Sequence, residues 1–223
     1  MVKNVILISG KLQSGKNTFT DMLMKELQPT GLKVGFDFFA KPVKDQSKEV
    51  FENLITYLNE ISEKYNIPEL KTVEENWYED KNKITRILLQ TYGTKIFRKL
   101  VDPAWWEKLL RERICIDRNE EILFITDVRF KTEISTIMDK DSFERHGVTI
   151  IPKYNVIKIR VERDNFDRPD DPIYTDESEI DLDDYSDWDL VIKNNSDLSS
   201  LLKQAEQTTR FILERVSKKS QKN

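Results

Sequence analysis

The chain has 223 residues, of which 38% are hydrophobic and 34% are charged, and its formal net charge is −4. This mixed, slightly acidic composition is typical of a globular surface and disfavours nucleic acid polymers and anionic membranes as partners. One cysteine, Cys115, excludes an internal disulfide. The N-terminal apolar run is too short for a signal peptide, and no later run is long enough to cross a membrane, so we expect a cytoplasmic protein.

The most informative stretch lies at the start of the chain. An apolar run over 4–9 is followed by Gly10-x4-Gly15-Lys16 and then by a segment with helical periodicity over 16–27. Strand, glycine loop and helix in this order predict a phosphate-binding P-loop. The glycines let backbone N–H groups, including that of Ser14, turn inward around a phosphate chain, and Lys16 adds a positive charge.

The position after the loop lysine departs from the usual pattern. A serine or threonine normally stands there and its hydroxyl contacts Mg²⁺. Here Asn17 follows the lysine, and Thr18 comes one residue later. Either the Asn17 amide oxygen or the Thr18 hydroxyl could serve as a hard oxygen ligand, and the sequence does not choose between them.

The next predicted elements are a strand over 34–39 and a helix over 44–64. Lys41 and Lys44 lie where this strand meets the helix, a usual ligand position in an α/β sheet, although ordinary surface lysines would look the same. Residues 65–83 are polar and predict an irregular excursion. A helix over 82–100 places Arg86 and Gln90 on one face, which suits a phosphate and a base edge or, alternatively, a solvated helix face.

Asp102-Pro103 then predicts the start of another helix, in which Trp106 either packs in the core or edges a pocket. A buried strand over 122–126 follows and ends in Asp127-Val128-Arg129. A carboxylate and an arginine at the end of such a strand can order Mg²⁺ and hold a phosphate, or form a structural ion pair. We expect Thr132 to cap the next helix and Gly147 to close it, with His146 as a helix C-terminal contact.

The last third of the chain predicts two more strands, over 155–162 and 188–193, and a final helix capped by Asp197. Between the strands, residues 163–184 are polar and contain Arg163 and Arg168, as expected of a solvated loop or of a mobile lid. Five strands separated by helices predict one doubly wound, mainly parallel α/β domain with helical insertions.

With these residues placed, the sequence resembles the P-loop nucleoside monophosphate kinases, and more narrowly the bacteriophage deoxynucleoside monophosphate kinases, over nearly the whole chain. Two positions differ from that family, which usually has aspartate where Asn17 stands and often a histidine where Asp176 stands. The segments that carry the resemblance are Ser14-Gly15-Lys16-x-Thr18, Phe39-Ala40-Lys41-Pro42-Val43-Lys44-Asp45, Arg86-x-Leu88-Leu89-Gln90-x-x-Gly93-Thr94, the helix start near Trp106, Asp127-x-Arg129 with Glu133, and Ser178-Glu179.

The resemblance implies a P-loop kinase domain over 1–223, with a helical acceptor-binding insertion over 45–100 and a lid over 163–184. It implies transfer of the ATP γ-phosphoryl group to a (deoxy)nucleoside monophosphate in deoxynucleotide biosynthesis, with Mg²⁺ as cofactor. The implied catalytic residues are Lys16, Asp127, Arg129 and Arg163. The implied ATP-binding residues are Gly10, Ser14, Gly15, Lys16, Asn17, Thr18 and Arg168. The implied acceptor-binding residues are Lys41, Lys44, Arg86, Gln90, Trp106, Arg129 and Glu133, and the implied metal ligands are Asn17, Thr18 and Asp127.

Two other functions stay open at this stage. One is a P-loop kinase for a different small acceptor, such as one resembling phosphomevalonate or dephospho-coenzyme A. The other is a nucleotide-binding module that lost catalysis at Asn17. The sequence also leaves open the base preference and the oligomeric state, and a homodimer is one possibility. If the source is viral, we expect the protein in the host cytoplasm.

Overall fold

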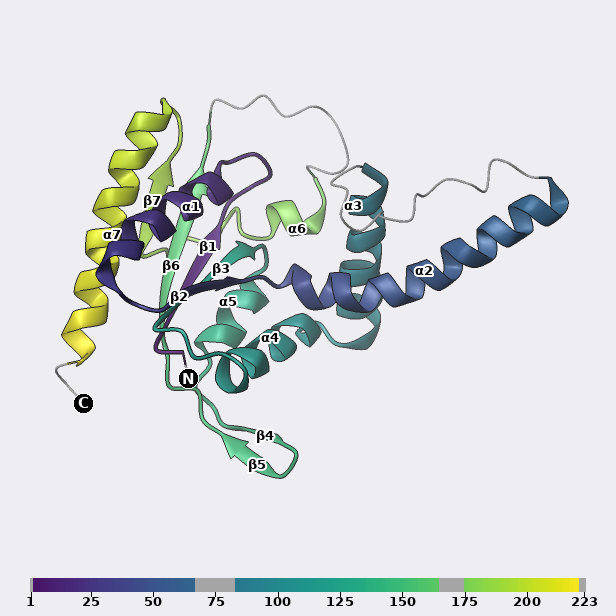
Figure 1. The fold of residues 1–223 in the computed structure, drawn as a ribbon, viewed down its shortest axis with the longest axis horizontal. Helices are drawn as coiled ribbons and strands as arrows, with labels where there is room; N and C mark the ends of the chain where they lie inside the picture. The colour runs from purple at the N-terminus through teal and green to yellow at the C-terminus, as the bar shows by residue number, and fades with distance from the viewer. Residues whose placement is uncertain (1, 67–82, 165–174, 221–223) are drawn as a thin grey trace. The chain divides into compact units, whose positions relative to one another are not determined.

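The computed structural model describes residues 2–66, 83–164 and 175–220 (Figure 1). The chain divides into two compact units. The larger unit contains Met1–Phe39 and Glu107–Asn223, and it carries the sheet. The smaller unit, Ala40–Trp106, is helical in the part that the structure describes.

The larger unit is built on a five-stranded parallel sheet in the order β2-β3-β1-β6-β7. The central strand β1 is buried along its whole length, as expected of a parallel strand with helices on both faces. At its carboxyl end, Ser9 pairs with Val128 of β3 and with Arg160 of β6. These strands are β1 Asn4–Ser9, β2 Val34–Asp37, β3 Ile122–Val128, β6 Asn155–Glu162 and β7 Leu190–Lys193.

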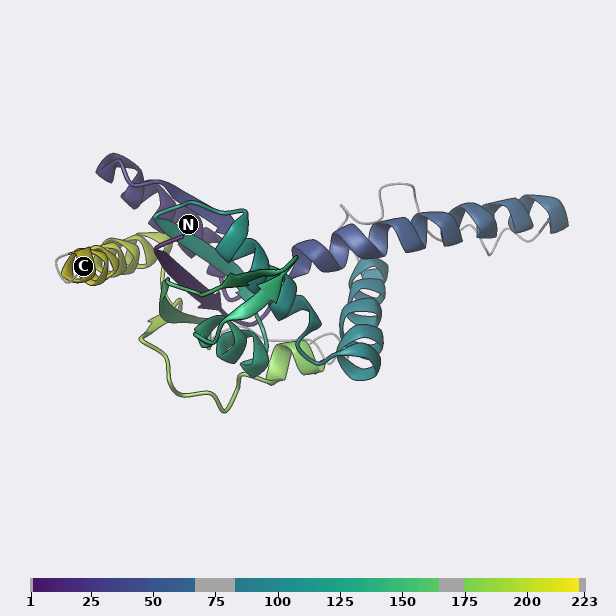
Figure 2. The ribbon, with the colours of Figure 1, turned by 90° about the horizontal axis from the view of Figure 1, so that it is seen from below.

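Helices cover both faces of this sheet, so the predicted α/β class with a five-stranded parallel sheet is confirmed. On one face α1, Lys16–Leu27, and α7, Leu198–Ser220, pack over a core that includes Phe19 and Ile159 (Figures 1 and 2). On the other face α4, Trp105–Ile116, and α5, Lys131–Met138, pack over a second core that includes Leu123. Alternate residues of β1 and β3 feed the two cores.

The smaller unit contains α2, Ala40–Tyr65, α3, Lys83–Gln90, and the π-helical segment η3, Thr91–Val101. Helix α2 begins four residues before the predicted helix because Pro42 lies in its first turn, where a missing N–H removes no helical bond. Strand β2 correspondingly ends at Asp37, two residues before the predicted end. Most of the predicted excursion over 65–83 lies outside the described residues.

The prediction of a helix capped by Thr132 and closed by Gly147 was wrong at both ends, because the N-cap is Phe130 and Thr132 lies inside the helix. Helix α5 ends at Met138, and the chain then forms a hairpin of β4, Phe143–Arg145, and β5, Val148–Ile150. His146 and Gly147 are its two turn residues, both with positive φ, so they make a hairpin turn and do not end a helix. Two short helical turns complete the described part, η1, Gln28–Thr30, and α6, Glu177–Ile180.

Candidate functional site

The loop between β1 and α1 has a backbone suited to holding an anion. Gln13 and Gly15 both have positive φ, of 63° and 89°, and helix α1 begins at the next residue, Lys16. The first N–H bond inside the helix runs from Phe19 to the Gly15 carbonyl at 2.9 Å. The preceding N–H groups have no partner inside the helix, so the helix start offers several donors and a partial positive charge in one place.

Neighbouring groups fix the shape of this loop. A Cβ at Gly10 would lie 2.6 Å from the Val161 carbonyl oxygen of β6, so only glycine fits there without a shift. The Asn194 side chain donates a hydrogen bond of 2.9 Å to the Ser14 carbonyl and fills the space that a side chain at Gly15 would need. The two glycines of the sequence motif are therefore required by close packing as well as by backbone conformation.

Charged side chains from the carboxyl end of β3, from β6 and from α6 act on the loop lysine. Burial and the positive charge of Arg129 lower the pKa of Lys16 from 10.5 to about 8, with a smaller contribution from Arg160, while Glu179 and Asp127 oppose this shift. Lys16 and these four charged groups therefore lie close enough for electrostatic interaction. A phosphate group that entered beside Lys16 would relieve both the lost hydration and the repulsion between cations.

Glu179 connects two parts of this site. One carboxylate oxygen accepts a hydrogen bond of 2.8 Å from the Leu12 amide of the loop, and the other forms an ion pair with Arg129. Burial on its own would lower the pKa of Arg129, but the carboxylates of Glu179, Asp127 and Glu133 together raise it. The Arg129 guanidinium thus stays charged in a half-buried position, with its side chain 32% exposed.

Asp127 and Glu133 hold backbone groups near the carboxyl end of β3. One Asp127 oxygen accepts the Phe39 amide at 2.8 Å. One Glu133 oxygen accepts the amides of Arg129 and Phe130 at 2.6 and 3.1 Å, and the residue is 2% exposed. The structure thus gives Glu133, predicted as an acceptor-binding residue, the structural task of capping α5 and orienting the Arg129 backbone.

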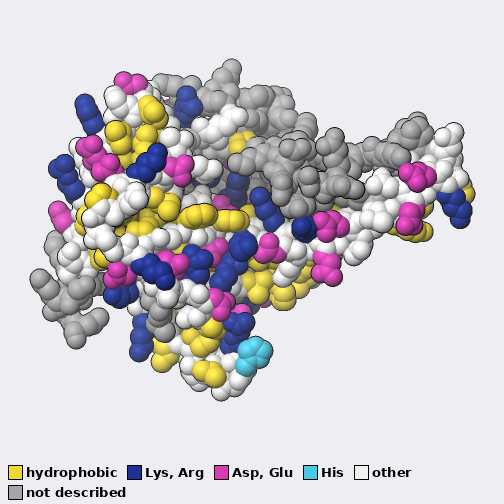
Figure 3. All heavy atoms as spheres, viewed as in Figure 1, with side chains coloured by type: hydrophobic (Ala, Val, Ile, Leu, Met, Phe, Trp, Pro, Cys, Tyr) yellow, Lys and Arg dark blue, Asp and Glu magenta, His cyan; other side chains and the backbone are white. Residues whose placement is uncertain are grey.

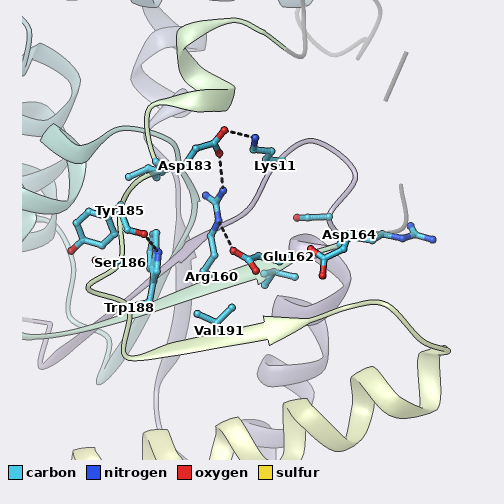
Figure 4. Close-up of a pocket in the computed structure, with 13 residues that line it drawn as sticks. Lys11, Arg160, Glu162, Asp164, Asp183, Tyr185, Ser186, Trp188 and Val191 are labelled. Atoms are coloured by element: carbon cyan, nitrogen blue, oxygen red, sulfur yellow. Dashed lines mark hydrogen bonds and ion pairs between the residues drawn. The ribbon is translucent and has the colours of Figure 1, made fainter. Parts of the chain in front are cut away.

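A cavity of about 580 Å³ adjoins the loop, between β6 and the segment that leads from α6 to β7 (Figure 4). Its wall carries both signs of charge. Asp183 pairs with Lys11 at 2.5 Å and with Arg160 at 3.6 Å, and Arg160 also donates to the Ser9 hydroxyl at 2.8 Å. Arg163, predicted as catalytic, is exposed and lines this cavity just after β6.

The larger unit thus brings together Lys16, Asp127 and Arg129 from the predicted set, with Gly10, Ser14, Gly15, Asn17 and Thr18 on the same loop and helix start. Arg168 lies outside the described residues. Glu133 and Arg163 also belong to the larger unit, whereas the other predicted residues belong to the smaller unit. Lys41 and Lys44 lie in α2, where Lys41 pairs with Asp45 at 3.4 Å. Arg86 and Gln90 lie in α3.

Trp106, predicted as an acceptor-binding residue, has a packing role in the structure. It is 1% exposed, and its indole N–H donates to the Gly93 carbonyl at 2.9 Å. The rings of Tyr92 and Phe97 lie 6.2 and 4.9 Å from it, between ring centres. The residue therefore anchors η3 within the smaller unit, and its polar hydrogen is already used.

Sequence reasoning missed Glu179, Arg160, Asp183 and Asn194 as members of the site. Glu179 was part of a quoted motif but had no assigned role. Arg160 lies in the middle of a predicted strand, where only the register with Ser9 reveals that it lies beside the loop. Asn194 directly follows β7, and a polar residue just after a parallel strand was the signal that could have identified it.

The described residues contain no group of three or more His, Cys, Asp and Glu side chains that could hold a metal ion. The oxygen donors of Asn17, Thr18 and Asp127 nevertheless have the chemistry that Mg²⁺ prefers, and Mg²⁺ commonly binds through one or two protein groups together with substrate phosphates. The chemistry of this donor set therefore fits Mg²⁺.

No protein-family model and no curated protein matches the sequence of this chain.

Among the described helices, none is long and apolar enough to cross a membrane. On the face shown in Figure 3, basic and acidic side chains are intermixed.

Proposed function

We propose that the protein is a P-loop phosphotransferase that moves the γ-phosphoryl group of ATP to a (deoxy)nucleoside monophosphate. One observation carries the proposal: a glycine loop with two positive-φ residues leads from the central parallel strand into a helix that begins at Lys16, beside Asp127 and Arg129. The sheet order β2-β3-β1-β6-β7 supports it further, because the loop then lies at the carboxyl end of the strand around which the order reverses.

In this proposal the protein acts mainly through position and charge. The loop amides and Lys16 hold the β- and γ-phosphates, and Arg129 stabilises the charge that spreads over the transferred group. Asn17 or Thr18, with Asp127, would hold Mg²⁺, which neutralises phosphate charge when bound. Lys41, Lys44, Arg86 and Gln90 of the smaller unit remain the proposed acceptor-binding residues, and Arg163 and Arg168 the proposed lid arginines.

The test is a chromatographic assay with ATP, Mg²⁺ and each common ribonucleoside and deoxynucleoside monophosphate. We expect a diphosphate from at least one acceptor and a decrease in kcat/KM of at least about 100-fold in Lys16→Ala, which removes a charged donor to the transferred phosphate. Lys25→Ala is the matched control, since Lys25 lies in the last turn of the same helix. It should retain the wild-type rate.

Two results would contradict the proposal in different ways. Transfer to a phosphorylated acceptor other than a nucleotide would keep the P-loop phosphotransferase and replace the acceptor class. Tight binding of ATP, lost in Lys16→Ala, with no transfer to any acceptor would identify a nucleotide-binding module instead.

A further inference from the structure

The short segment 179–183 brings two carboxylates to the cations around the loop. Glu179 contacts the Leu12 amide and Arg129, and Asp183 pairs with Lys11 and Arg160. The two differ in burial, because the Glu179 side chain is 4% exposed and that of Asp183 is 44% exposed. Figure 4 shows Asp183 between Lys11 and Arg160 at the rim of the cavity. Glu179 is therefore the better-fixed member of the pair.

Each carboxylate oxygen of Glu179 has its own partner, and the two partners belong to different parts of the larger unit. Leu12 lies in the loop after β1, and Arg129 follows β3. One rigid, buried carboxylate therefore sets the distance between the loop backbone and the guanidinium. A buried carboxylate with a charged partner and a backbone donor forms strong, directional hydrogen bonds, so it can hold that distance.

We propose that Glu179 is a positioning residue for phosphoryl transfer, which acts by holding Arg129 and the loop backbone at Leu12 in register. This inference rests on the proposed function and adds a residue to it. Glu179 touches no reacting atom in this role. Its effect passes through Arg129, because the guanidinium must face the transferred group in a single orientation to stabilise its charge.

Glu179→Gln tests the inference, because the side chain keeps its shape but has one acceptor oxygen for two donors. We expect kcat to fall at least about tenfold while the KM for ATP stays within about threefold of wild type, since misplacement of a group affects the transition state more than the ground state. Asp184→Asn is the matched control. Asp184 directly follows this segment, is exposed and pairs with Lys131, so this variant should keep the wild-type kcat.

A double-mutant cycle shows whether Glu179 acts through Arg129. If it does, kcat of Glu179→Gln combined with Arg129→Ala equals that of Arg129→Ala within about twofold, because the second change removes nothing further. Independent losses that multiply in the double variant would overturn the inference. A purely structural role would lower the amount of folded protein and leave kcat per folded molecule unchanged.

The contact itself has a readout that needs no activity. The Leu12 amide donates to Glu179, so its hydrogen exchange should become at least about tenfold faster in Glu179→Ala and should not change in Asp184→Asn. Glu179→Asp, which keeps the charge but shortens the reach, should reproduce the loss of kcat and provides a second variant if Glu179→Gln does not fold.

The failures of the two proposals are distinguishable. Wild-type kcat in a folded Glu179→Gln or Glu179→Asp, or unchanged Leu12 exchange in Glu179→Ala, would overturn the inference on Glu179 and leave the phosphotransferase intact. A wild-type protein that transfers no phosphoryl group to any acceptor would overturn the proposed function and, with it, the positioning role.

Discussion

Two arginine–carboxylate pairs in the larger unit have similarly buried carboxylates and different surroundings. Arg113 of α4 donates two hydrogen bonds to Asp37 at the end of β2, at 2.9 and 2.6 Å. Arg129 pairs with Glu179 beside the loop. The two carboxylate side chains are 3% and 4% exposed, so burial does not separate them.

The two pairs differ in the other groups that their members contact. Asp37 also accepts the adjacent Phe38 amide, and Arg113 also donates to the Phe38 carbonyl, so that pair joins α4 to the end of β2. Arg129, by contrast, lowers the pKa of Lys16 and shares Glu179 with a loop amide. An ion pair alone therefore indicates a structural role. Two cations that repel each other beside the backbone donors of a helix start, as Lys16 and Arg129 do, indicate a binding site for an anion.

The largest expected difference between the pairs is in turnover. Arg129→Ala should lower kcat about 10²- to 10³-fold, because it removes a charged donor from the transferred group. Arg113→Ala should leave kcat per folded molecule within about threefold of wild type. Diphosphate formation measured against the concentration of folded protein tests both. Equal losses in the two variants would mean that Arg129 is no more than a structural partner.

The pairs should differ less in stability. Arg113→Ala leaves the buried Asp37 carboxylate without its charged partner, which costs about 3 to 5 kcal/mol of unfolding free energy. Urea unfolding followed by circular dichroism measures this loss. Arg113→Lys serves as control, since it keeps the charge but loses the two-point geometry and should recover part of the stability. A loss below about 1 kcal/mol in Arg113→Ala would show that water enters and screens Asp37.

The elements with strong periodicity were predicted well from the sequence. Helix 16–27 and strand 155–162 have the predicted bounds because long apolar patterns and a glycine loop define them. The hairpin over 143–150 was missed because its two strands have three residues each, too few to show an alternating pattern. The π-helical turns over 91–101 were missed as such because eleven residues hold too few turns for the apolar positions to distinguish the wider i→i+5 helix from an α-helix.

The site was predicted in part for a similar reason. Lys16 directly follows the glycine loop, and Asp127 and Arg129 lie at the carboxyl end of the buried strand β3. Such positions converge in any parallel sheet. Glu179 could not be selected from sequence because it lies among many carboxylates, and Arg160 depends on the register of two strands. The sequence pattern does not reveal which of several side chains of the same charge is buried in the tertiary structure.

The sharpest contrast between the regions concerns the sign of a stability change. Burial and the nearby Arg129 lower the pKa of Lys16 from 10.5 to about 8, so its charged form is less stable in the folded protein than in the unfolded chain. That penalty is fully present below pH 8, decreases as the pH rises from about 8 to 10.5, and is absent above that range. Lys16→Met should therefore stabilise the protein near pH 7 by about 1 to 2 kcal/mol, a value reduced for partial solvent screening.

We therefore expect removal of the Lys16 charge to raise the free energy of unfolding and removal of the Arg113 charge to lower it. Unfolding in urea at pH 7 and at pH 10.5 measures the effect, and the gain in Lys16→Met should be smaller at the higher pH. Lys25→Met is the control, because Lys25 is at the last turn of the same helix and a gain there would indicate a general benefit of methionine in α1. Destabilisation of Lys16→Met at pH 7 would instead mean that Glu179 and Asp127 already compensate Lys16, and the site would then hold no unbalanced charge for a phosphate to neutralise.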